Sequence, residues 1–430
     1  MRPAAPRRPG IPCLALVSLL AALPAAADDW SHWRGPTGNG VAPTARPPLE
    51  FGPGRNERWR AEIPGRGSSS PVVHGERVFV TTAVPAGNGA EGSFDFRVLC
   101  LDRATGRERW SRTVVTARPH EGTHQTNGFA SASPCTDGER VYAHFGSRGL
   151  FCLSIDGEPL WDRDFGEMTI RNGFGEGSSP TLHGDVILVP WDHEGPSALF
   201  CLDARTGKTV WEVPRDEPTG WCTPLVTADR GGRKQVIMNG QNAARGYDLG
   251  TGRELWRCAG QTQRPCASAV AADGTAWVGS GFRGAFLAAF DLSGTGDLEG
   301  GKAVRWTHPR NTPDVASPLL SQGRLYFYKE KSGLLTCLEA ATGKPLWETA
   351  RVEGVNATYA SPIAAAGRVY LTDRRGAVVV IADAPALEIL ATNMVGEGVD
   401  ATPAAAGDAL FVRGERHLFC FSEERAAPTP

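Results

Sequence analysis

The chain has 430 residues, a formal net charge of −2 and 52 glycines. Its basic residues are scattered along the sequence, which argues against a nucleic-acid interface or a surface for anionic membranes. No stretch has the periodicity of a long amphipathic helix. These features leave a fold made of short strands and turns.

The first residues have the composition of a secretory signal. A charged region (Arg2, Arg7 and Arg8) precedes an apolar stretch over 11–20, and small residues follow at 25–27. We therefore predict a signal peptide over 1–27 that is cleaved near Ala27. The apolar stretch is too short to span a membrane, so we expect a soluble exported protein, periplasmic or extracellular, without an integral membrane segment. Residues 28–56 are expected to form an N-terminal arm.

Most of the remaining chain, residues 57–421, reads as eight related units. Each unit begins with a short polar residue, usually before proline, and these starts are Ser70, Ser133, Ser179, Thr223, Ser268, Ser317, Ser361 and Thr402. Proline costs no ladder hydrogen bond when it is the first residue of a strand. A period near 40 to 50 residues indicates stacked supersecondary units that bury their faces only against each other.

Most units also contain a turn followed by a tryptophan, and the seventh, with Leu387–Leu390 at this position, has none. The pattern Asp-x-x-Thr-Gly occurs at 102–106, 203–207 and 248–252, with glutamate in place of aspartate at 339–343. Aspartate can bond turn amides through its side chain, and glycine accepts a positive φ. The tryptophans that follow such turns are expected to pack against the neighbouring sheet, and they are Trp110, Trp161, Trp211, Trp256, Trp306 and Trp347.

Four strands and a tryptophan in each unit predict an all-β, eight-bladed β-propeller of four-stranded antiparallel blades. The eighth unit supplies only three strands before the chain ends, and its missing outer strand is found at Glu57–Arg60. We therefore predict that this N-terminal strand completes the last blade and closes the ring. Residues 422–430 are expected to form a disordered tail.

Nine cysteines follow the predicted signal peptide. Five of them (Cys100, Cys152, Cys201, Cys337 and Cys420) occupy the same strand position in different units, so they are too far apart to pair. Cys258 and Cys266 are the pair that could meet, and the sequence leaves their pairing open. Neither a Cys-x-x-Cys pair nor metal-ligand spacing is present, so we predict no metal site.

The string Cys-Leu-Asp-x-x-Thr-Gly-x-x-x-Trp at 201–211 resembles the repeat of pyrroloquinoline quinone (PQQ) type propellers. The resemblance covers residues 57–421. That family includes quinoprotein dehydrogenases, the envelope-assembly lipoprotein BamB and many secreted PQQ-like propellers of unassigned role. The segments at 30–36 and 123–127 are similar to this last group.

The resemblance implies features of the dehydrogenases that can be sought in this sequence. Those enzymes use a disulfide between adjacent cysteines, a stacking tryptophan, and Ca²⁺ held by glutamate, asparagine and aspartate beside an aspartate base. The chain contains no Cys-Cys, and the ligand set cannot be placed on it residue by residue. We therefore assign no catalytic residue and expect no cofactor, with PQQ and Ca²⁺ as the alternative. The absence of a lipid-acceptor cysteine is a departure from BamB.

A binding site is expected where the loops between successive blades meet at the channel mouth. These loops run from the fourth strand of one blade to the first strand of the next, and they carry histidine, arginine, carboxylate, amide and aromatic groups. The candidate binding residues are His120, His124, Asn127, Glu176, Trp221, Arg264, Arg310, Asp314 and Asp400. Trp191–Glu194, between two strands of the third blade, is expected on the same face.

The sequence therefore predicts an exported propeller that binds a small molecule or an envelope protein at its mouth face. Two other hypotheses remain. One is a PQQ-dependent oxidoreductase of the alcohol or sugar dehydrogenase type, and the other is an envelope-assembly scaffold like BamB.

Overall fold

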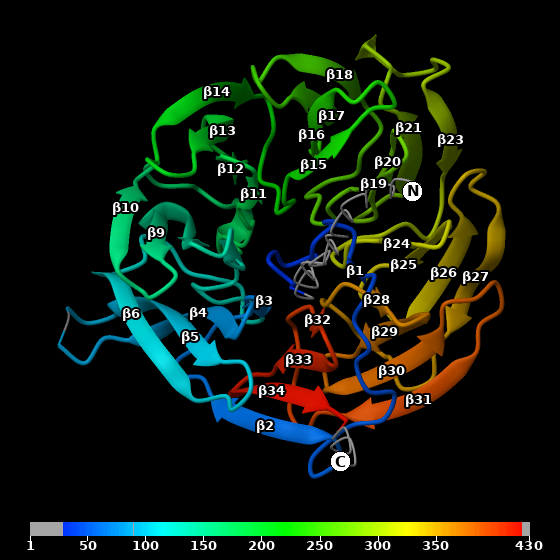
Figure 1. Ribbon diagram of the computed structural model, residues 1–430. Helices are drawn as coiled ribbons and strands as arrows, with labels where there is room; N and C mark the ends of the chain where they lie inside the picture. Colours follow the sequence, from blue (N-terminus) through cyan, green and yellow to red (C-terminus); the bar gives the residue numbers. More distant parts are fainter. Residues whose placement is uncertain (1–28, 89, 424–430) are drawn as a thin grey trace, which may run out of the picture.

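The computed structural model describes residues 29–88 and 90–423, and it forms a ring of eight sheets around a central channel (Figure 1). The predicted signal peptide lies outside the described residues, as does most of the predicted tail. No helix in the described part of the chain is long and apolar enough to cross a membrane. The predicted eight-bladed β-propeller is confirmed.

Each of the first four blades is an antiparallel sheet whose strands follow one another from the channel outward. Blade 1 contains β3 (Val72–His74), β4 (Arg77–Pro85), β5 (Phe94–Asp102) and β6 (Glu108–Ala117). Blade 2 contains β7 (Cys135–Thr136), β8 (Arg140–His144), β9 (Leu150–Ser154) and β10 (Pro159–Arg163). Blade 3 contains β11 (Thr181–His183), β12 (Val186–Trp191), β13 (Ser197–Asp203) and β14 (Thr209–Arg215). Blade 4 contains β15 (Leu225–Ala228), β16 (Lys234–Met238), β17 (Ala244–Asp248), β18 (Glu254–Cys258) and a short parallel strand, β22 (Gly296–Asp297).

The other four blades complete the ring. Blade 5 contains β19 (Val270–Ala272), β20 (Thr275–Ser280), β21 (Phe286–Asp291) and β23 (Val304–His308). Blade 6 contains β24 (Leu319–Ser321), β25 (Arg324–Tyr328), β26 (Leu334–Glu339) and β27 (Pro345–Arg351). Blade 7 contains β28 (Ile363–Ala365), β29 (Arg368–Thr372), β30 (Ala377–Ala382) and β31 (Ile389–Met394), and β1 (Val41–Ala42) pairs with β28 on the channel side. Blade 8 contains β32 (Ala404–Ala406), β33 (Ala409–Arg413), β34 (His417–Ser422) and β2 (Glu57–Glu62).

The N-terminal strand closes the ring as predicted. Strand β2 pairs antiparallel with β34, with Trp59 opposite Cys420 (Figure 1). The indole of Trp59 is 8% exposed, and its Nε1 donates to the carbonyl of Arg103 in blade 1 at 2.9 Å. One strand therefore completes blade 8 and also fastens that blade to blade 1.

The same contact explains the turn-and-tryptophan pattern around the ring. The indoles of Trp110, Trp161, Trp211 and Trp306 each donate to a carbonyl in the turn of the next blade at 2.9–3.1 Å. The turn glycine lies directly against the indole, so that a Cβ on Gly207 would come within 2.7 Å of the Trp161 ring. Trp256 and Trp347 are the exceptions among the predicted set. Trp256 is fully buried within blade 4 and donates to Gln235, and the Nε1 of Trp347 has no hydrogen-bond partner among the described residues.

The eight unit starts form a belt of hydrogen bonds around the channel. The hydroxyls of seven starts, all but Ser70, each accept the backbone N–H of the start in the preceding blade, from Ser70→Ser133 through Ser361→Thr402, at 2.8–3.2 Å. This position favours serine and threonine because each carries a hydroxyl oxygen on Cβ, which is the acceptor of the hydrogen bond. The belt holds the inner ends of the blades in register.

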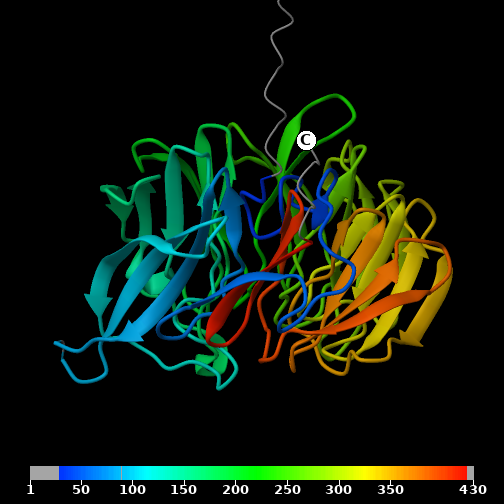
Figure 2. The same ribbon diagram turned by 60° about the horizontal axis from the view of Figure 1, so that its bottom comes forward.

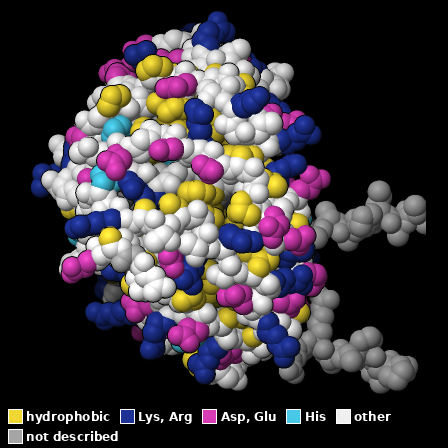
Figure 3. Space-filling view, turned by 90° about the vertical axis from the view of Figure 1, so that its left-hand side faces the viewer, with side chains coloured by type: hydrophobic (Ala, Val, Ile, Leu, Met, Phe, Trp, Pro, Cys, Tyr) yellow, Lys and Arg dark blue, Asp and Glu magenta, His cyan; other side chains and the backbone are white. Residues whose placement is uncertain are grey.

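The cysteines and the outer surface fit this architecture. All nine cysteines after Cys13 are free thiols, so Cys258 and Cys266 form no disulfide. On the side of the ring drawn in Figure 3, hydrophobic side chains lie among charged side chains of both signs. This mixture agrees with the small net charge and gives that side no basic surface for a polyanion.

Candidate functional site

A cavity of about 420 Å³ occupies the channel on the mouth side of the serine belt. Its inner wall includes Ser70, Ser133 and Ser179 of the belt, and Trp33 of the N-terminal arm also lines it. The arm lies in the centre of the ring, toward the upper end in Figure 2. The cavity has a volume within the range of about 300–1,000 Å³ that is typical of small-molecule sites.

Five aromatic side chains line this mouth cavity, and they come from widely separated parts of the chain. Four belong to loops of blades 2 to 7, and one belongs to the arm; they are Trp33, Phe174, Trp221, Phe282 and Tyr359. The indole of Trp221 is oriented by its hydrogen bond to the carbonyl of Gly175 at 2.8 Å. Fixed aromatic faces of this kind favour a ligand with a flat, apolar ring.

The charges around the cavity are nearly balanced, with one exception. Arg264 pairs with the buried carboxylate of Asp314 at 3.2 Å, and Arg374 forms two hydrogen bonds with Asp400 at 2.6 and 2.9 Å. Burial raises the pKa of Asp314, although the nearby Arg264 acts in the opposite direction. The ammonium of Lys331 lies 5.2 Å from the ring of Tyr359 and has no carboxylate within 4.0 Å in the described part of the chain. Lys331 therefore supplies a cation that forms no ion pair with the described residues, although its charge acts to lower the pKa of the nearby Asp314.

A loop from blade 1 crosses part of the mouth. Its His124 Nδ1 contacts the hydroxyl of Thr126 at 2.8 Å, and this hydroxyl lies 3.3 Å from the phenol of Tyr359 in blade 7. The backbone N–H of His124 donates to the carbonyl of Phe174 in blade 3 at 3.2 Å. The loop is therefore held at both sides of the opening, and its polar groups face the cavity that they partly cover.

A second cavity of about 40 Å³ lies beside the first, among blades 1 to 3. Glu176 accepts the backbone N–H of Ser147 at 2.8 Å and also its hydroxyl, and burial raises the pKa of this carboxyl group. His144, also in the wall, is 2% exposed, and burial lowers its pKa to about 4. A polar space of this size suits bound water rather than an organic ligand.

Acidification is expected to destabilise the fold through these buried imidazoles. The pKa of His144, and that of His32 in the arm, are lowered to about 4 by burial, whereas an unfolded histidine titrates near 6.5. The unfolded chain therefore binds more protons between those values, and stability falls as the pH decreases from about 6.5 to 4. The loss is on the order of 3 kcal/mol for each histidine. Urea unfolding at several pH values should show a shallower decline for His144→Gln, and an unchanged decline would contradict this assignment.

The structure divides the nine sequence-predicted residues into groups. His124, Asn127, Trp221, Arg264 and Asp400 line the mouth cavity, and His120 and Glu176 line the small one, which Trp221 also reaches. Asp314 lies behind Arg264 as its ion-pair partner. Arg310 lies apart from both cavities, with its side chain 69% exposed and paired with Glu348 of the outer strand β27.

The residues that sequence reasoning missed come from two places. Phe282 and Lys331 lie in loops between the second and third strands of blades 5 and 6, which open on the same face as the interblade loops. This placement was expected only for Trp191–Glu194. Trp33 belongs to the arm, whose path through the ring has no signal in the repeat pattern.

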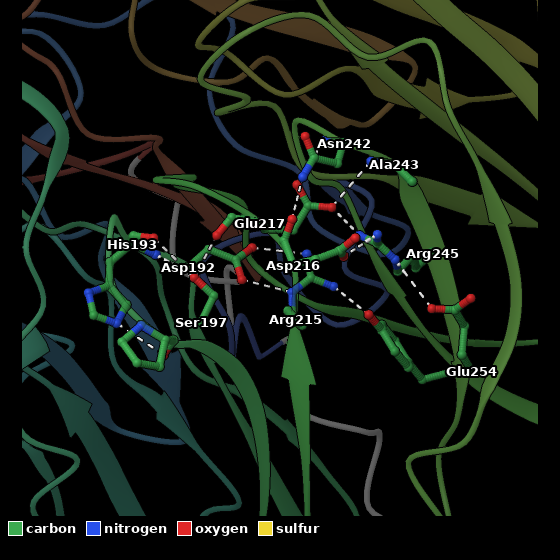
Figure 4. A network of polar contacts seen from close by, with 12 residues as sticks. Asp192, His193, Ser197, Arg215, Asp216, Glu217, Asn242, Ala243, Arg245 and Glu254 are labelled. Atoms are coloured by element: carbon green, nitrogen blue, oxygen red, sulfur yellow. Dashed lines mark hydrogen bonds and ion pairs between the residues drawn. The ribbon is translucent and has the colours of Figure 1, made fainter.

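A buried network of charges supports the loop that carries Trp221 (Figure 4). Glu217 accepts two backbone N–H groups from blade 4, at Asn242 and Ala243, and it pairs with the guanidinium of Arg245. Glu217 and Arg245 are both almost completely buried. The loop Glu217–Trp221 is therefore clamped at its start against the next blade.

The residues present do not fit a Ca²⁺–quinone centre. No group of three or more histidine, cysteine, aspartate or glutamate side chains in residues 29–88 and 90–423 could hold a metal ion. Asp400, which lines the mouth cavity, and Asp314, which lies behind Arg264, are already paired with arginines. Adjacent cysteines, which the dehydrogenases use against the quinone, are absent from the sequence.

Known proteins of the same architecture are similar to this chain. A family model described as outer membrane protein assembly factor BamB matches residues 54–172, 152–295 and 297–387. BamB from Burkholderia pseudomallei is 26% identical over 215 residues, which is 48% of this chain and 49% of that protein. The chain thus aligns with about half of that relative's length.

Solved structures show the same fold at low sequence identity. BamB from Moraxella catarrhalis superposes with a TM-score of 0.58 at 13% identity, over 87% of this chain and 99% of that one. Quinohemoprotein alcohol dehydrogenase from Comamonas testosteroni gives 0.64 at 12% identity, over 94% and 82% of the two chains. Because the family model covers most of the ring, the chain belongs to the PQQ-repeat β-propeller family.

Proposed function

We propose that this protein binds a small organic molecule in the mouth cavity, and that the ligand combines a flat ring with an acidic group. The single observation that carries the proposal is the composition of the cavity wall, where five aromatic side chains and a lysine that forms no ion pair with the described residues line the same space. The aromatic faces favour the ring. The ammonium of Lys331 favours the acidic group, because an unpaired cation in a partly buried site gains most from an anionic partner. As its predicted signal peptide implies, we propose that the protein acts outside the cytoplasm.

Two fluorescent probes that differ in one group test this proposal. Anilinonaphthalene sulfonate (ANS) carries a ring system and an acid, and phenylnaphthylamine is its neutral analogue. We expect both to bind to the folded protein with one site, and we expect Lys331→Met to weaken ANS binding about tenfold while leaving the neutral probe unchanged. Trp221→Ala should weaken both probes.

The matched control is Arg310→Met, which removes an exposed cation outside both cavities and should change neither affinity. Calorimetric titration gives the affinities, and a thermal melt of each variant separates lost binding from lost folding. If neither probe binds to wild-type protein at one site, the cavity is not the working surface.

A scaffold role is the second candidate, and one observation on the outer surface favours it. Strand β31 exposes three apolar side chains, Ile389, Leu390 and Met394, which are 37–50% exposed. Apolar groups gathered on one outer strand are typical of a contact surface. Family membership with an assembly factor is compatible with this role. The absence of single-site probe binding would make this candidate the stronger one.

A quinoprotein oxidoreductase is the candidate that the site supports least. The adjacent cysteines of those enzymes are absent from the sequence, and no group of three or more histidine, cysteine, aspartate or glutamate side chains in the described residues could hold a metal ion. The likeness to the dehydrogenase structure, at 12% identity, concerns the fold alone.

A further inference from the structure

The N-terminal arm, residues 29–47, is built into the centre of the ring. Its Trp30 exchanges two backbone hydrogen bonds with Val73 of blade 1, at 2.8 and 2.9 Å, and the carbonyl of Ser31 accepts the N–H of Thr136 in blade 2 at 3.1 Å. Trp30 is 0% exposed. The beginning of the arm is therefore held as firmly as a strand of the propeller.

Arg34 fastens the arm to the opposite side of the ring. Its buried guanidinium donates to the carbonyls of Pro318 at 2.5 Å and Pro362 at 3.0 Å, which are the unit-start prolines of blades 6 and 7. No carboxylate of the described residues lies within 4.0 Å of it. A Cβ on Gly40, which has φ +82°, would lie 2.7 Å from the guanidinium carbon, so glycine is required there.

Asn39 fastens the arm to blade 5. Its side-chain amide donates to the carbonyl of Ala271 at 2.8 Å, and its oxygen accepts the N–H of the same residue at 2.9 Å. The carbonyl of Gly40 then accepts the N–H of Ala364 at 2.8 Å, where β1 joins blade 7. The arm thus contacts inner strands on all sides of the channel.

Trp33 lies between these anchoring residues, and its side chain lines the mouth cavity. It is half-buried, it is preceded and followed by fastened residues, and it lines the mouth cavity together with the belt serines. The arm is the part of the chain that supplies an aromatic surface at the inner end of that cavity. The segment Trp30–Gly40 therefore connects the hub of the ring with the wall of the candidate site.

We propose that the arm is a working part of the ligand site: Trp33 contacts the bound molecule, and ligand binding is coupled to docking of the arm. This inference rests on the proposed function, because it names a further residue and a regulation of the same cavity. A ligand that contacts Trp33 only in the docked state must stabilise that state, and a docked arm must in turn raise the affinity for the ligand. Docking of the arm and binding of the ligand are then thermodynamically coupled.

The test follows amide hydrogen exchange in the arm with and without ANS. Exchange at Trp30, Val73 and Ala364 reports release of the arm, because their N–H groups make the docking hydrogen bonds. At an ANS concentration of about one hundred times its dissociation constant, exchange at these amides should slow about tenfold, because the protection cannot exceed the affinity that the Trp33 contact supplies. Amides of the outer strand pair β5–β6 serve as the internal control, since they lie outside the arm contacts.

Two variants separate the ligand contact from the docking contact. Trp33→Leu keeps the anchors, and it should weaken ANS about tenfold and remove most of the ANS protection of the arm. Asn39→Ala, which does not line the cavity, should speed arm exchange, and ANS should largely restore it. Trp306→Ala removes a tryptophan that contacts neither the arm nor the cavity, and it should leave ANS affinity unchanged.

The outcomes distinguish this inference from the proposed function. If ANS binds to wild-type protein but the arm exchanges at the same rate with and without it, the coupling is wrong and the proposed function stands. If Trp33→Leu binds ANS as wild type does, Trp33 is not a ligand contact. If ANS does not bind at all, the proposed function fails, and the coupling fails with it.

Discussion

A chain that begins at Ile63, and so lacks both the arm and β2, is expected to lose cooperative folding. It would leave blade 8 with three strands and would remove Trp59 from its contact with blade 1. Loss of one buried tryptophan typically costs about 3–5 kcal/mol, and the complete stability of a domain is typically about 5–15 kcal/mol. The arm contacts at the hub are lost in addition. Thermal and urea unfolding should therefore show a broad transition, or none, in place of the wild-type transition.

A chain that begins at Leu49 is the matched control, because it keeps β2 and lacks only the arm. It should fold with a lowered melting temperature, since the ring is still closed by the pairing of β2 with β34. A chain that begins at Ile63 and melts like wild type would contradict the closure. Equal losses in the two truncations would mean that the hub, and not the closing strand, carries the stability.

The parts of this fold that were predictable from sequence are those that repeat locally. The unit starts, the Asp-x-x-Thr-Gly turns and the tryptophans can each be explained by local physical chemistry. The outer strand of the eighth blade could be found by counting the strands in each unit. The structure adds the partner of each element: a start hydroxyl accepts the backbone N–H of the start in the preceding blade, and the indoles donate to the next blade's turn. Such partners lie about one repeat away, so the period itself places them.

The arm could not be predicted in this way. Arg34 and its acceptor at Pro362 are 328 positions apart, and Asn39 and Ala271 are 232 apart. The segment has no hydrophobic alternation and no counterpart in any repeat, so its glycines and its asparagine gave no indication of where they dock. Its contacts depend on the finished ring, which presents the free inner edges of several blades to one segment.

The candidate site was partly predictable for a related reason. Loop position around the ring follows from topology, so residues such as Trp221 and Arg264 were brought to the mouth. The direction of a side chain at the end of a polar loop does not follow from topology. Arg310 accordingly points outward to Glu348. Lys331, from the loop between the second and third strands of blade 6, lines the cavity.

Breaking the buried ion pair between Asp192 and Arg215 is expected to destabilise the protein strongly. Arg215 forms two hydrogen bonds with Asp192, at 2.7 and 2.9 Å, and a third with the phenol of Tyr247 at 2.7 Å (Figure 4). The side chains of Arg215 and Asp192 are 0% and 4% exposed. Asp192→Ala would leave the guanidinium buried without its counterion, which costs about 3–5 kcal/mol.

A pair of comparisons shows whether burial is the cause of this effect. Asp156→Ala removes an ion pair of the same length, with Arg77 at 2.7 Å, but its carboxylate is 73% exposed, and the expected loss is below about 1 kcal/mol. The double variant Asp192→Leu with Arg215→Met removes both buried charges and should recover most of the stability, because a well-packed apolar pair can replace a buried ion pair. Urea unfolding of these variants supplies the free energies. An Asp192→Ala loss no greater than that of Asp156→Ala would mean that water reaches Arg215 and that burial does not strengthen this pair.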